Sequence, residues 1–185
     1  MTAHRRRFLQ TLTAMAPVAL AWKSFAASND AKKQTVRIAQ FDPSGKPKGI
    51  VELEKVIKPD AEWRKQLTPL QYDVTRREGT ERAFTGPLYN NHEDGLYLCI
   101  CCGTALFDSK TKYESHTGWP SFWAPIAKEN IAGKEDKSYG MDRQEVECAR
   151  CNAHLGHVFD DGPPPTHLRY CMNSASLTFA PRAKS

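Results

Sequence analysis

The sequence predicts a mainly β domain of antiparallel sheets, preceded by short helices. After Gly95 the chain breaks into short runs of alternating, β-branched or aromatic residues, separated by Gly, Pro and Asn. No segment after residue 80 has an apolar periodicity of helix length. Hydrophobic residues make up 40% of the 185 residues, which is enough for one domain with its own core.

Residues 1–26 have the three-part layout of an export signal. A basic start leads into an apolar stretch, and residues 24–26 (SFA) offer a small-x-small cleavage site, with residues 19–21 (ALA) as second choice. Residues 5–9 (RRRFL) fit the twin-arginine form, which exports folded proteins. A retained amphipathic helix is the alternative, although Pro17 disfavours a long one. We therefore expect a periplasmic or otherwise exported protein.

The charge of the remaining chain is nearly balanced. The formal net charge is +5, but the leader holds four basic residues and no acids, which leaves 22 basic and 21 acidic side chains. This balance gives no reason to expect binding to nucleic acid or to an anionic membrane surface. No later apolar run is long enough to span a membrane.

Two short helices are expected before the strands. Residues 27–58 are polar and are predicted to be a linker with a turn at DPSGKPKG. Asp60 is expected to cap a helix over 61–67. Thr68 begins a capping box with Pro69 at the first helical position of a second helix, which Gly79 ends.

The strands are expected to follow in quick succession. Each candidate is a short run bounded by turn residues. The predicted strands span 96–100, 105–107, 112–115, 141–148, 154–159 and 168–180.

Four of the six cysteines form two matched pairs. Cys99/Cys102 and Cys148/Cys151 resemble zinc knuckles, because a two-residue spacer lets one tight turn aim both sulfurs at a tetrahedral ion. Each pair is followed by Gly or Asn, which tolerate a left-handed backbone, and this parallel selects Cys102 over Cys101. Four thiolates leave no open position, so we expect one structural Zn²⁺ per chain. A redox Cys-x-x-Cys pair and two local disulfides are the alternatives.

Cys171 is left without a partner in the sequence pattern. In the run LRYCMN, side chains alternate between the two faces of a strand, so Cys171 shares its face with Arg169 and Asn173. We expect Arg169 to lower the thiol pKa from about 8.5 by 1–2 units, because a unit charge at about 4 Å supplies on the order of 4 kcal/mol at intermediate dielectric. An inert buried cysteine is the alternative.

Two histidines and two aromatic residues are further candidates. His154 and His157 would lie on opposite faces of a regular strand, but Gly156 permits a bulge that turns both inward. Imidazoles near a thiol can move protons, whereas paired structural histidines are the alternative. Trp119 and Phe122 beside a Gly-Trp-Pro turn fit either core packing or an aromatic wall for an apolar methyl group.

Several stretches together resemble the methionine-R-sulfoxide reductases of the B type. They are TPLQYDVTRREGTERAFTG, CICCGTALF, KYESHTGWPSFW, CARCNAHLGHVFDDGP and RYCMNSASL. The resemblance covers about residues 60–180, and GWPSF, HLGHVF and RYC-x-NSASL in this order are specific to it. It implies a two-sheet β-tent (Mss4-like) domain over 59–181, with a four-cysteine zinc site remote from the catalytic face.

The resemblance also implies a reaction. Cys171 would attack the sulfur of methionine-R-sulfoxide, free or in proteins, and take up its oxygen as a sulfenic acid, which repairs oxidised proteins. Arg169 and Asn173 would shape the thiolate environment. His154 and His157 would handle the sulfoxide oxygen and its proton. The expected enzyme is a peptide-methionine (R)-S-oxide reductase that acts as a monomer.

The remaining implied residues hold the histidines and the substrate. Asp161 matches an acid that positions the two histidines, and Trp119 matches the aromatic residue that cages the substrate methyl group. The aromatic residues implied at the substrate are Trp119, Phe122 and Phe159.

The chain departs from many relatives at Thr117, where they carry a resolving cysteine. The sulfenic acid is therefore expected to react with an outside thiol, such as a thioredoxin-like partner, or with Cys101 if that residue can approach. A zinc-bearing binding module without activity and a dithiol oxidoreductase remain alternatives. A binding module has no need for Arg169, Cys171 and Asn173 on one face.

Overall fold

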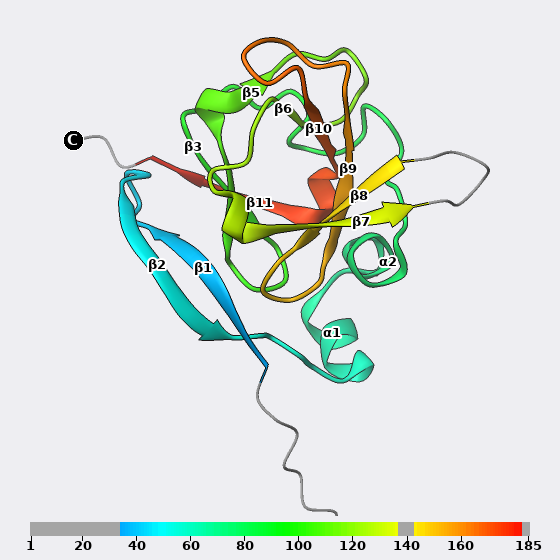
Figure 1. Cartoon of the computed structure of the whole chain (residues 1–185). Helices are drawn as coiled ribbons and strands as arrows, with labels where there is room; N and C mark the ends of the chain where they lie inside the picture. The colour runs from blue at the N-terminus through cyan, green and yellow to red at the C-terminus, as the bar shows by residue number, and fades with distance from the viewer. Residues whose placement is uncertain (1–33, 137–142, 183–185) are drawn as a thin grey trace, which may run out of the picture. The chain divides into compact units, whose positions relative to one another are not determined.

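The computed structural model describes residues 34–136 and 143–182, and the expected leader lies outside these ranges. The described chain is mainly β, as predicted, with antiparallel pairing throughout (Figure 1). The strands are β1 Thr35–Phe41, β2 Pro47–Glu54, β3 Gly95–Cys99, β4 Ala105–Asp108, β5 Lys112–Tyr113, β6 Ser121–Phe122, β7 Ile131–Asp136, β8 Arg143–Cys148, β9 His154–Phe159, β10 Arg169–Met172 and β11 Leu177–Pro181.

The strands form two larger sheets and one hairpin. The order in the six-stranded sheet is β5-β6-β10-β9-β8-β7, and the order in the three-stranded sheet is β11-β3-β4. Strands β1 and β2 pair only with each other. Most candidate strands after Gly95 are found in the structure, although residues 141 and 142 lie outside the described ranges and the candidate at 112–115 is a strand only over Lys112–Tyr113. The candidate at 168–180 is not one strand: a 3-10 turn at Ser174–Ser176 divides it into β10 and β11, which belong to different sheets. The short strands β6 and β7 were not predicted.

The β1–β2 hairpin corrects the prediction of a linker over residues 27–58. Its turn is the predicted DPSGKPKG segment, but the polar residues on either side pair as strands. Buried Asn130 fixes the hairpin to the body: its side chain accepts from the Ala39 N–H at 2.8 Å and donates to the Ala39 carbonyl at 2.9 Å. One buried amide therefore attaches a segment whose own composition gave no sign of burial.

The two helices precede the large sheets. Helix α2, Pro69–Arg77, has the predicted capping box: Gln71 N donates to Thr68 Oγ1 and Thr68 N donates to Gln71 Oε1. Glu78, in a left-handed conformation, is its C-cap. The last helical residue is Arg77, and Gly79, predicted to end the helix, directly follows the cap.

Helix α1, Asp60–Gln66, begins differently from the prediction. Pro59 is its N-cap and makes no side-chain cap hydrogen bond. Asp60 is therefore the first helical residue, and its carboxylate pairs with Arg64 at 2.7 Å. No helix in the described ranges is long and apolar enough to cross a membrane.

The core lies between the sheets and the helices. Its largest fully buried side chains come from both sheets. They include Tyr97, Phe107, Phe122, Leu106, Leu155 and Met172. Phe122 stacks on Phe107 with ring centroids 4.4 Å apart.

Candidate active site and four-cysteine cluster

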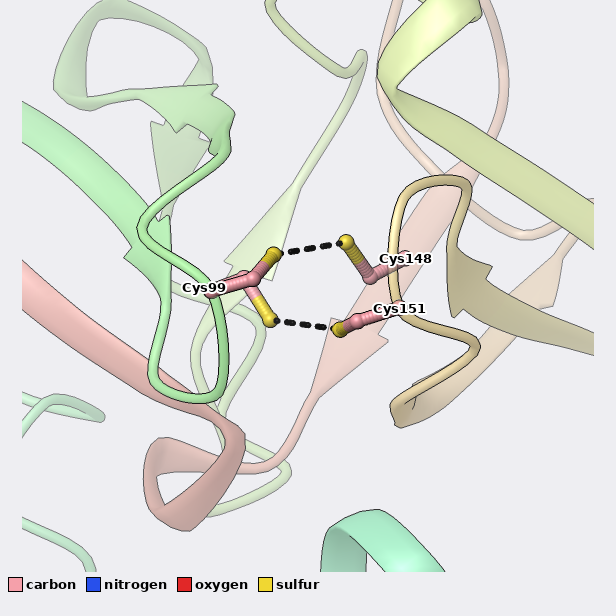
Figure 2. Close-up of side chains that lie close together, drawn as sticks. Cys99, Cys148 and Cys151 are labelled. Carbon is pink, nitrogen blue, oxygen red and sulfur yellow. Dashed lines mark hydrogen bonds between the residues drawn. The ribbon is translucent and has the colours of Figure 1, made fainter. Parts of the chain in front are cut away.

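The two cysteine pairs meet in one cluster. The sulfurs of Cys99, Cys102, Cys148 and Cys151 all lie within 4.8 Å of one another. Cys99 is 3.6 Å from Cys151, and Cys102 is 3.6 Å from Cys148, as Figure 2 shows for the labelled residues. None of these cysteines is in a disulfide. The structure therefore places the pairs as a metal site requires and excludes the two local disulfides.

The geometry of the cluster fits a tetrahedral ion. Metal–sulfur bonds of about 2.3 Å in a tetrahedron put neighbouring sulfurs about 3.8 Å apart, close to the distances found. Gly103 and Asn152, which follow the pairs, have φ angles of +73° and 52°. The left-handed conformation predicted after each pair is confirmed, and it turns the chain so that both sulfurs face inward.

Cys101 is not one of the four cluster cysteines. Its side chain is only 4% exposed and interacts with the sulfurs of Cys99 and Cys151. Its carbonyl oxygen accepts a hydrogen bond from Gln66 Nε2 at 2.8 Å. Cys102 rather than Cys101 therefore belongs to the four-cysteine cluster, as the spacing predicted.

Cys171 lies on a different part of the fold, in the middle of the six-stranded sheet. In β10 it pairs with Ser121 of β6 on one side and with His157 of β9 on the other. Gly156 precedes His157, and a Cβ at this position would lie 2.1 Å from the Cys171 carbonyl oxygen. Only glycine therefore lets β9 approach β10 this closely.

A cavity of about 350 Å³ opens over Cys171. Its lining combines apolar, polar and charged side chains from five regions of the chain. The lining residues are Thr80, Thr117, Trp119, Arg143, Gly156, His157, Phe159, Arg169, Cys171, Met172 and Asn173. Cys171 itself is half-buried, with its Sγ 3.9 Å from Thr117 Oγ1. The strand alternation predicted for Arg169, Cys171 and Asn173 is confirmed.

The charge environment of Cys171 differs from the prediction. Burial raises the pKa of the Cys171 thiol, and this effect outweighs the opposing contributions of Thr117, Arg169 and Ser121. Arg169 is already paired: its Nε and Nη2 donate to the two Asp161 oxygens at 2.7 and 2.8 Å. Arg169 thus acts on the thiol in the predicted direction, but burial outweighs it, and its guanidinium is shared with Asp161.

His157 lines the cavity and is held from behind. Its Nε2 lies 2.9 Å from Asp136 Oδ2, which Arg143 Nη2 also contacts at 2.9 Å. Burial lowers the pKa of His157, although Asp136 opposes this shift. The imidazole is therefore neutral at pH 7. Because Nε2 is engaged with Asp136, Nδ1 is the nitrogen that remains for proton exchange.

His154 lies behind His157 rather than in the cavity. The bulge in β9 predicted near Gly156 is present, since the pairing with β8 shifts register there. His154 is 2% exposed, its Nδ1 is 2.7 Å from Glu145 Oε1, and the two imidazole centroids are 5.4 Å apart. Its Nε2 is buried without a hydrogen-bond partner in the described protein. His154 lines a second cavity, and His157 lies between this cavity and the one over Cys171, since it lines both.

Trp119 and Asn173 are both connected to Glu81. The Trp119 indole donates to the Glu81 carbonyl oxygen at 3.1 Å, and the Glu81 N–H donates to Asn173 Oδ1 at 3.0 Å. The buried Glu81 carboxylate accepts from the N–H groups of Ser174 and Ala175 at 2.6 and 2.9 Å. One residue thus ties the aromatic wall of the cavity to the chain that follows Cys171.

Comparison with known proteins places this site in a family. A family model described as the SelR domain matches residues 67–181. A peptide methionine sulfoxide reductase MsrB from Hahella chejuensis is 60% identical over 127 residues, which cover 69% of this chain and 91% of that protein. The chain belongs to the MsrB (SelR-domain) family.

Other MsrB proteins are similar to a comparable degree. The MsrB of Leptospira interrogans is 55% identical over 125 residues, covering 68% of this chain and 95% of that protein. Peptide methionine sulfoxide reductase B1, chloroplastic, of Arabidopsis thaliana is 56% identical over 138 residues, covering 72% and 68%. The SelR match begins after the β1–β2 hairpin, so the hairpin lies outside the matched domain.

Most residues implied by the MsrB resemblance meet at the cavity. Those lining it are Cys171, His157, Arg169, Asn173, Trp119 and Phe159. Arg169 lies over the Phe159 ring at 4.3 Å, which sets the position of the guanidinium above the cavity wall. Their roles in an MsrB reaction remain predictions.

Three implied MsrB residues, His154, Asp161 and Phe122, do not line this cavity. Asp161 pairs with Arg169, and the histidines hydrogen-bond to Asp136 and Glu145 instead, so the prediction that Asp161 positions them is corrected. Phe122 is 0% exposed. It neighbours Ser121 on β6, and because side chains alternate, Ser121 is directed toward Cys171 while Phe122 is directed into the core. Phe122 is therefore a core residue rather than a substrate contact.

Sequence reasoning missed the acids that hold the MsrB site. Asp136 lies in the unpredicted strand β7, and Glu145 lies on the predicted strand β8 directly opposite His157. Glu81 belongs to the quoted stretch GTERAFTG but was assigned no role. The available signal was an acid at an inward-facing strand position, which is unusual unless the acid has a partner.

Proposed function

We propose that Cys171 is the nucleophile of this protein, which is a peptide-methionine (R)-S-oxide reductase. The supporting observation is the Cys171 sulfur in a cavity walled by an indole, an imidazole and a guanidinium. Trp119 and Phe159 offer apolar surface to a methyl thioether, while His157 offers a nitrogen to the sulfoxide oxygen. The cavity has space for one side chain of this size.

The step balances without an outside proton. The Cys171 sulfur attacks the sulfoxide sulfur, the sulfur–oxygen bond of the substrate breaks, and oxygen transfers to Cys171 as a sulfenic acid. The thiol proton ends on that oxygen, and methionine leaves as the thioether. Because burial keeps the thiol protonated, Cys171 carries the required proton itself, and neutral His157 relays it.

The test is epimer-specific reduction. The purified protein is incubated with methionine-R-sulfoxide or methionine-S-sulfoxide and a dithiol, next to Cys171→Ser. We expect methionine only from the R epimer and only with the wild-type chain. Equal rates on both epimers, or an active serine variant, would contradict the proposal.

We also propose that the four-cysteine cluster holds one structural Zn²⁺. Cys99, Cys102, Cys148 and Cys151 would be its ligands, and four thiolates leave no position for substrate. The short sulfur–sulfur distances and the burial of three of the four cysteines support a closed site. Bound zinc would cross-link the loops after β3 and β8. The test is metal content per chain, for which about one zinc is expected.

The proposed reductant comes from outside the chain. The sulfenic acid on Cys171 would react with two thiols, which form a disulfide and release water. Thr117 rather than cysteine adjoins Cys171, and Cys101 is buried beside the metal cluster. Cys101→Ser should therefore keep turnover with a thioredoxin-like protein or a small dithiol. An intact first turnover followed by no recycling would instead identify Cys101 as the resolving residue.

Export by the twin-arginine route is proposed from the sequence of residues 1–26. Folding in the reducing cytoplasm would let the cluster bind zinc before its thiols meet an oxidising compartment. The test replaces the leader with one that exports unfolded chains. Equal accumulation of zinc-loaded protein from both leaders would remove the physical reason for this route.

A further inference from the structure

An exposed aromatic residue stands beside the cavity of Cys171. Phe84 is 58% exposed, and its N–H donates to the carbonyl oxygen of Gly118 at 2.9 Å. Gly118 lies between Thr117 and Trp119, which both line the cavity. Phe84 is therefore attached to the turn that forms one wall of the cavity.

The Phe84 ring is held against that turn and against a second ring. A Cβ at Gly118 would lie 2.7 Å from Cδ2 of Phe84, so the ring covers the glycine backbone. The ring centroids of Phe84 and Tyr89 are 5.7 Å apart with the planes at 83°, a favourable edge-to-face arrangement. We name Phe84 and Tyr89 the aromatic rim.

The backbone of Phe84 is unusual for an exposed apolar residue. Its φ of 64° lies in the left-handed region, which residues with a Cβ avoid. The other large exposed apolar side chains of the described ranges, Ile50, Ile57 and Leu70, do not have this conformation. A disfavoured backbone that keeps a ring in solvent indicates a function outside the core.

The segment that carries Phe84 is firmly anchored. Three residues earlier, Glu81 makes the four hydrogen bonds described above, to Trp119, Asn173 and two N–H groups after Asn173. Thr80 next to it lines the cavity. The rim is therefore fixed relative to the cavity before any substrate arrives, which reduces the entropy lost on binding.

We propose that Phe84, backed by Tyr89, is a specificity-determining residue that binds an apolar side chain flanking methionine sulfoxide in a polypeptide. This inference rests on the proposed reduction at Cys171. A cavity of about 350 Å³ holds the sulfoxide side chain, so the neighbouring residues of a peptide must cross its mouth. Phe84 contacts Gly118, whose two neighbours Thr117 and Trp119 line the cavity. Free methionine sulfoxide has no flanking residues and gains nothing from it.

The test compares three substrates. Two are blocked pentapeptides with a central methionine-R-sulfoxide, flanked by leucines in one and by glycines in the other, and the third is free methionine-R-sulfoxide. We expect wild type to prefer the leucine peptide over the glycine peptide by about tenfold in kcat/KM, the size of effect that burial of one apolar side chain gives. Phe84→Ala should reduce this preference to within about twofold, mainly through KM, and leave the free amino acid unaffected.

Two further variants keep the result interpretable. Phe84→Gly removes the ring and also relieves the left-handed conformation, so it reports the ring even if the alanine variant folds poorly. Leu70→Ala removes a side chain of similar exposure (51%) on α2 and should keep the preference. A preference that survives in both Phe84 variants, or a loss that is equal for all three substrates, overturns the role of the rim. Absence of reduction by wild type on every substrate would instead refute the proposed function.

Discussion

Two regions of this protein use cysteine in opposite ways. In the four-cysteine cluster, the sulfurs lie within 4.8 Å of one another, and three of the four residues are buried. At Cys171, a single half-buried sulfur lines an open cavity and has Thr117 and His157 as neighbours. The side chain is the same in both places. Its surroundings decide whether the sulfur is a structural ligand or is reachable by a substrate.

The backbone explains how the two arrangements arise. The cluster cysteines stand at tight turns, where left-handed Gly103 and Asn152 follow the pairs and direct two sulfurs the same way. Cys171 stands in the middle of β10, between β6 and β9. Neighbouring side chains of a strand point to opposite faces. The Cys171 sulfur is therefore separated from the side chains of Tyr170 and Met172, next to it in the sequence.

Removing one sulfur from the cluster should have the largest effect. Structural zinc contributes about 10–16 kcal/mol in small zinc-binding peptides, which is comparable to the whole stability of a domain. Cys148→Ser should therefore lose its zinc and its cooperative thermal unfolding, as measured by metal content and circular dichroism.

Matched variants at the other cysteines sharpen this comparison. Cys171→Ser should keep its zinc and unfold at nearly the wild-type temperature, since that sulfur contacts no metal ligand. Cys101→Ser should also keep its zinc, at a cost of about 1 kcal/mol for a buried substitution. Zinc loss in the Cys171 variant, or full zinc in the Cys148 variant, would break the distinction between the two regions.

Glu81 should show the next largest effect, because its hydrogen bonds connect the segments around Cys171, as the proposed zinc would connect the two cysteine pairs. Glu81→Ala leaves the buried N–H of Ser174 and the partly buried N–H of Ala175 without an acceptor. Each unsatisfied donor costs about 1–3 kcal/mol, so the loss in urea unfolding should be about 3 kcal/mol. Glu81→Gln keeps one acceptor oxygen and should lose about half as much. Wild-type stability in the alanine variant would show that the carboxylate hydrogen bonds contribute little.

The spacing of the cysteines and the alternation of side chains along a strand gave most of the correct predictions about the two regions. The two Cys-x-x-Cys pairs identified the four cluster cysteines, because a tight turn determines where both sulfurs point. The alternation in LRYCMN placed Arg169, Cys171 and Asn173 together, because a strand has two faces. Both rules are local, so they need no knowledge of the rest of the fold.

The misses depend on contacts between distant segments. The β1–β2 hairpin is polar and is fixed to the body by Asn130, far along the chain. Arg169 was expected to act on Cys171 alone, but its charge is compensated by Asp161. Phe122 followed the Gly-Trp-Pro turn like Trp119, yet only its register on β6 shows that it enters the core. No local pattern encodes such pairings.

A substitution at Thr117 can give Cys171 a neighbouring thiol, as the cysteines of the four-cysteine cluster have. Its Oγ1 lies 3.9 Å from Cys171 Sγ, so Thr117→Cys places a second thiol beside the nucleophile. We expect the sulfenic acid of the variant to be replaced by a disulfide after one turnover. Mass spectrometry after substrate, without reductant, should show loss of two hydrogens from the variant and gain of one oxygen in wild type. A persistent sulfenic acid in the variant would mean that the two side chains cannot approach to bonding distance.

Asp161 should have the smallest effect, because its side chain is 59% exposed and the solvent screens its charge. In wild type the Cys171 pKa is raised, so the thiol is protonated at pH 7 and its alkylation rate increases as the pH rises through the alkaline range. Asp161→Asn leaves the Arg169 charge uncompensated, which favours the thiolate and lowers that pKa. A fall of half to one unit raises iodoacetamide alkylation at pH 7 by about threefold to tenfold. Arg169→Gln should shift the profile the opposite way, toward higher pH, since it removes a positive charge that lowers the pKa of the thiol. Slower alkylation of Asp161→Asn would contradict this prediction. It would mean that the carboxylate orients the Arg169 guanidinium toward Cys171 rather than weakening its field. The reactivity of the thiol would then depend more on the position of Arg169 than on its net charge.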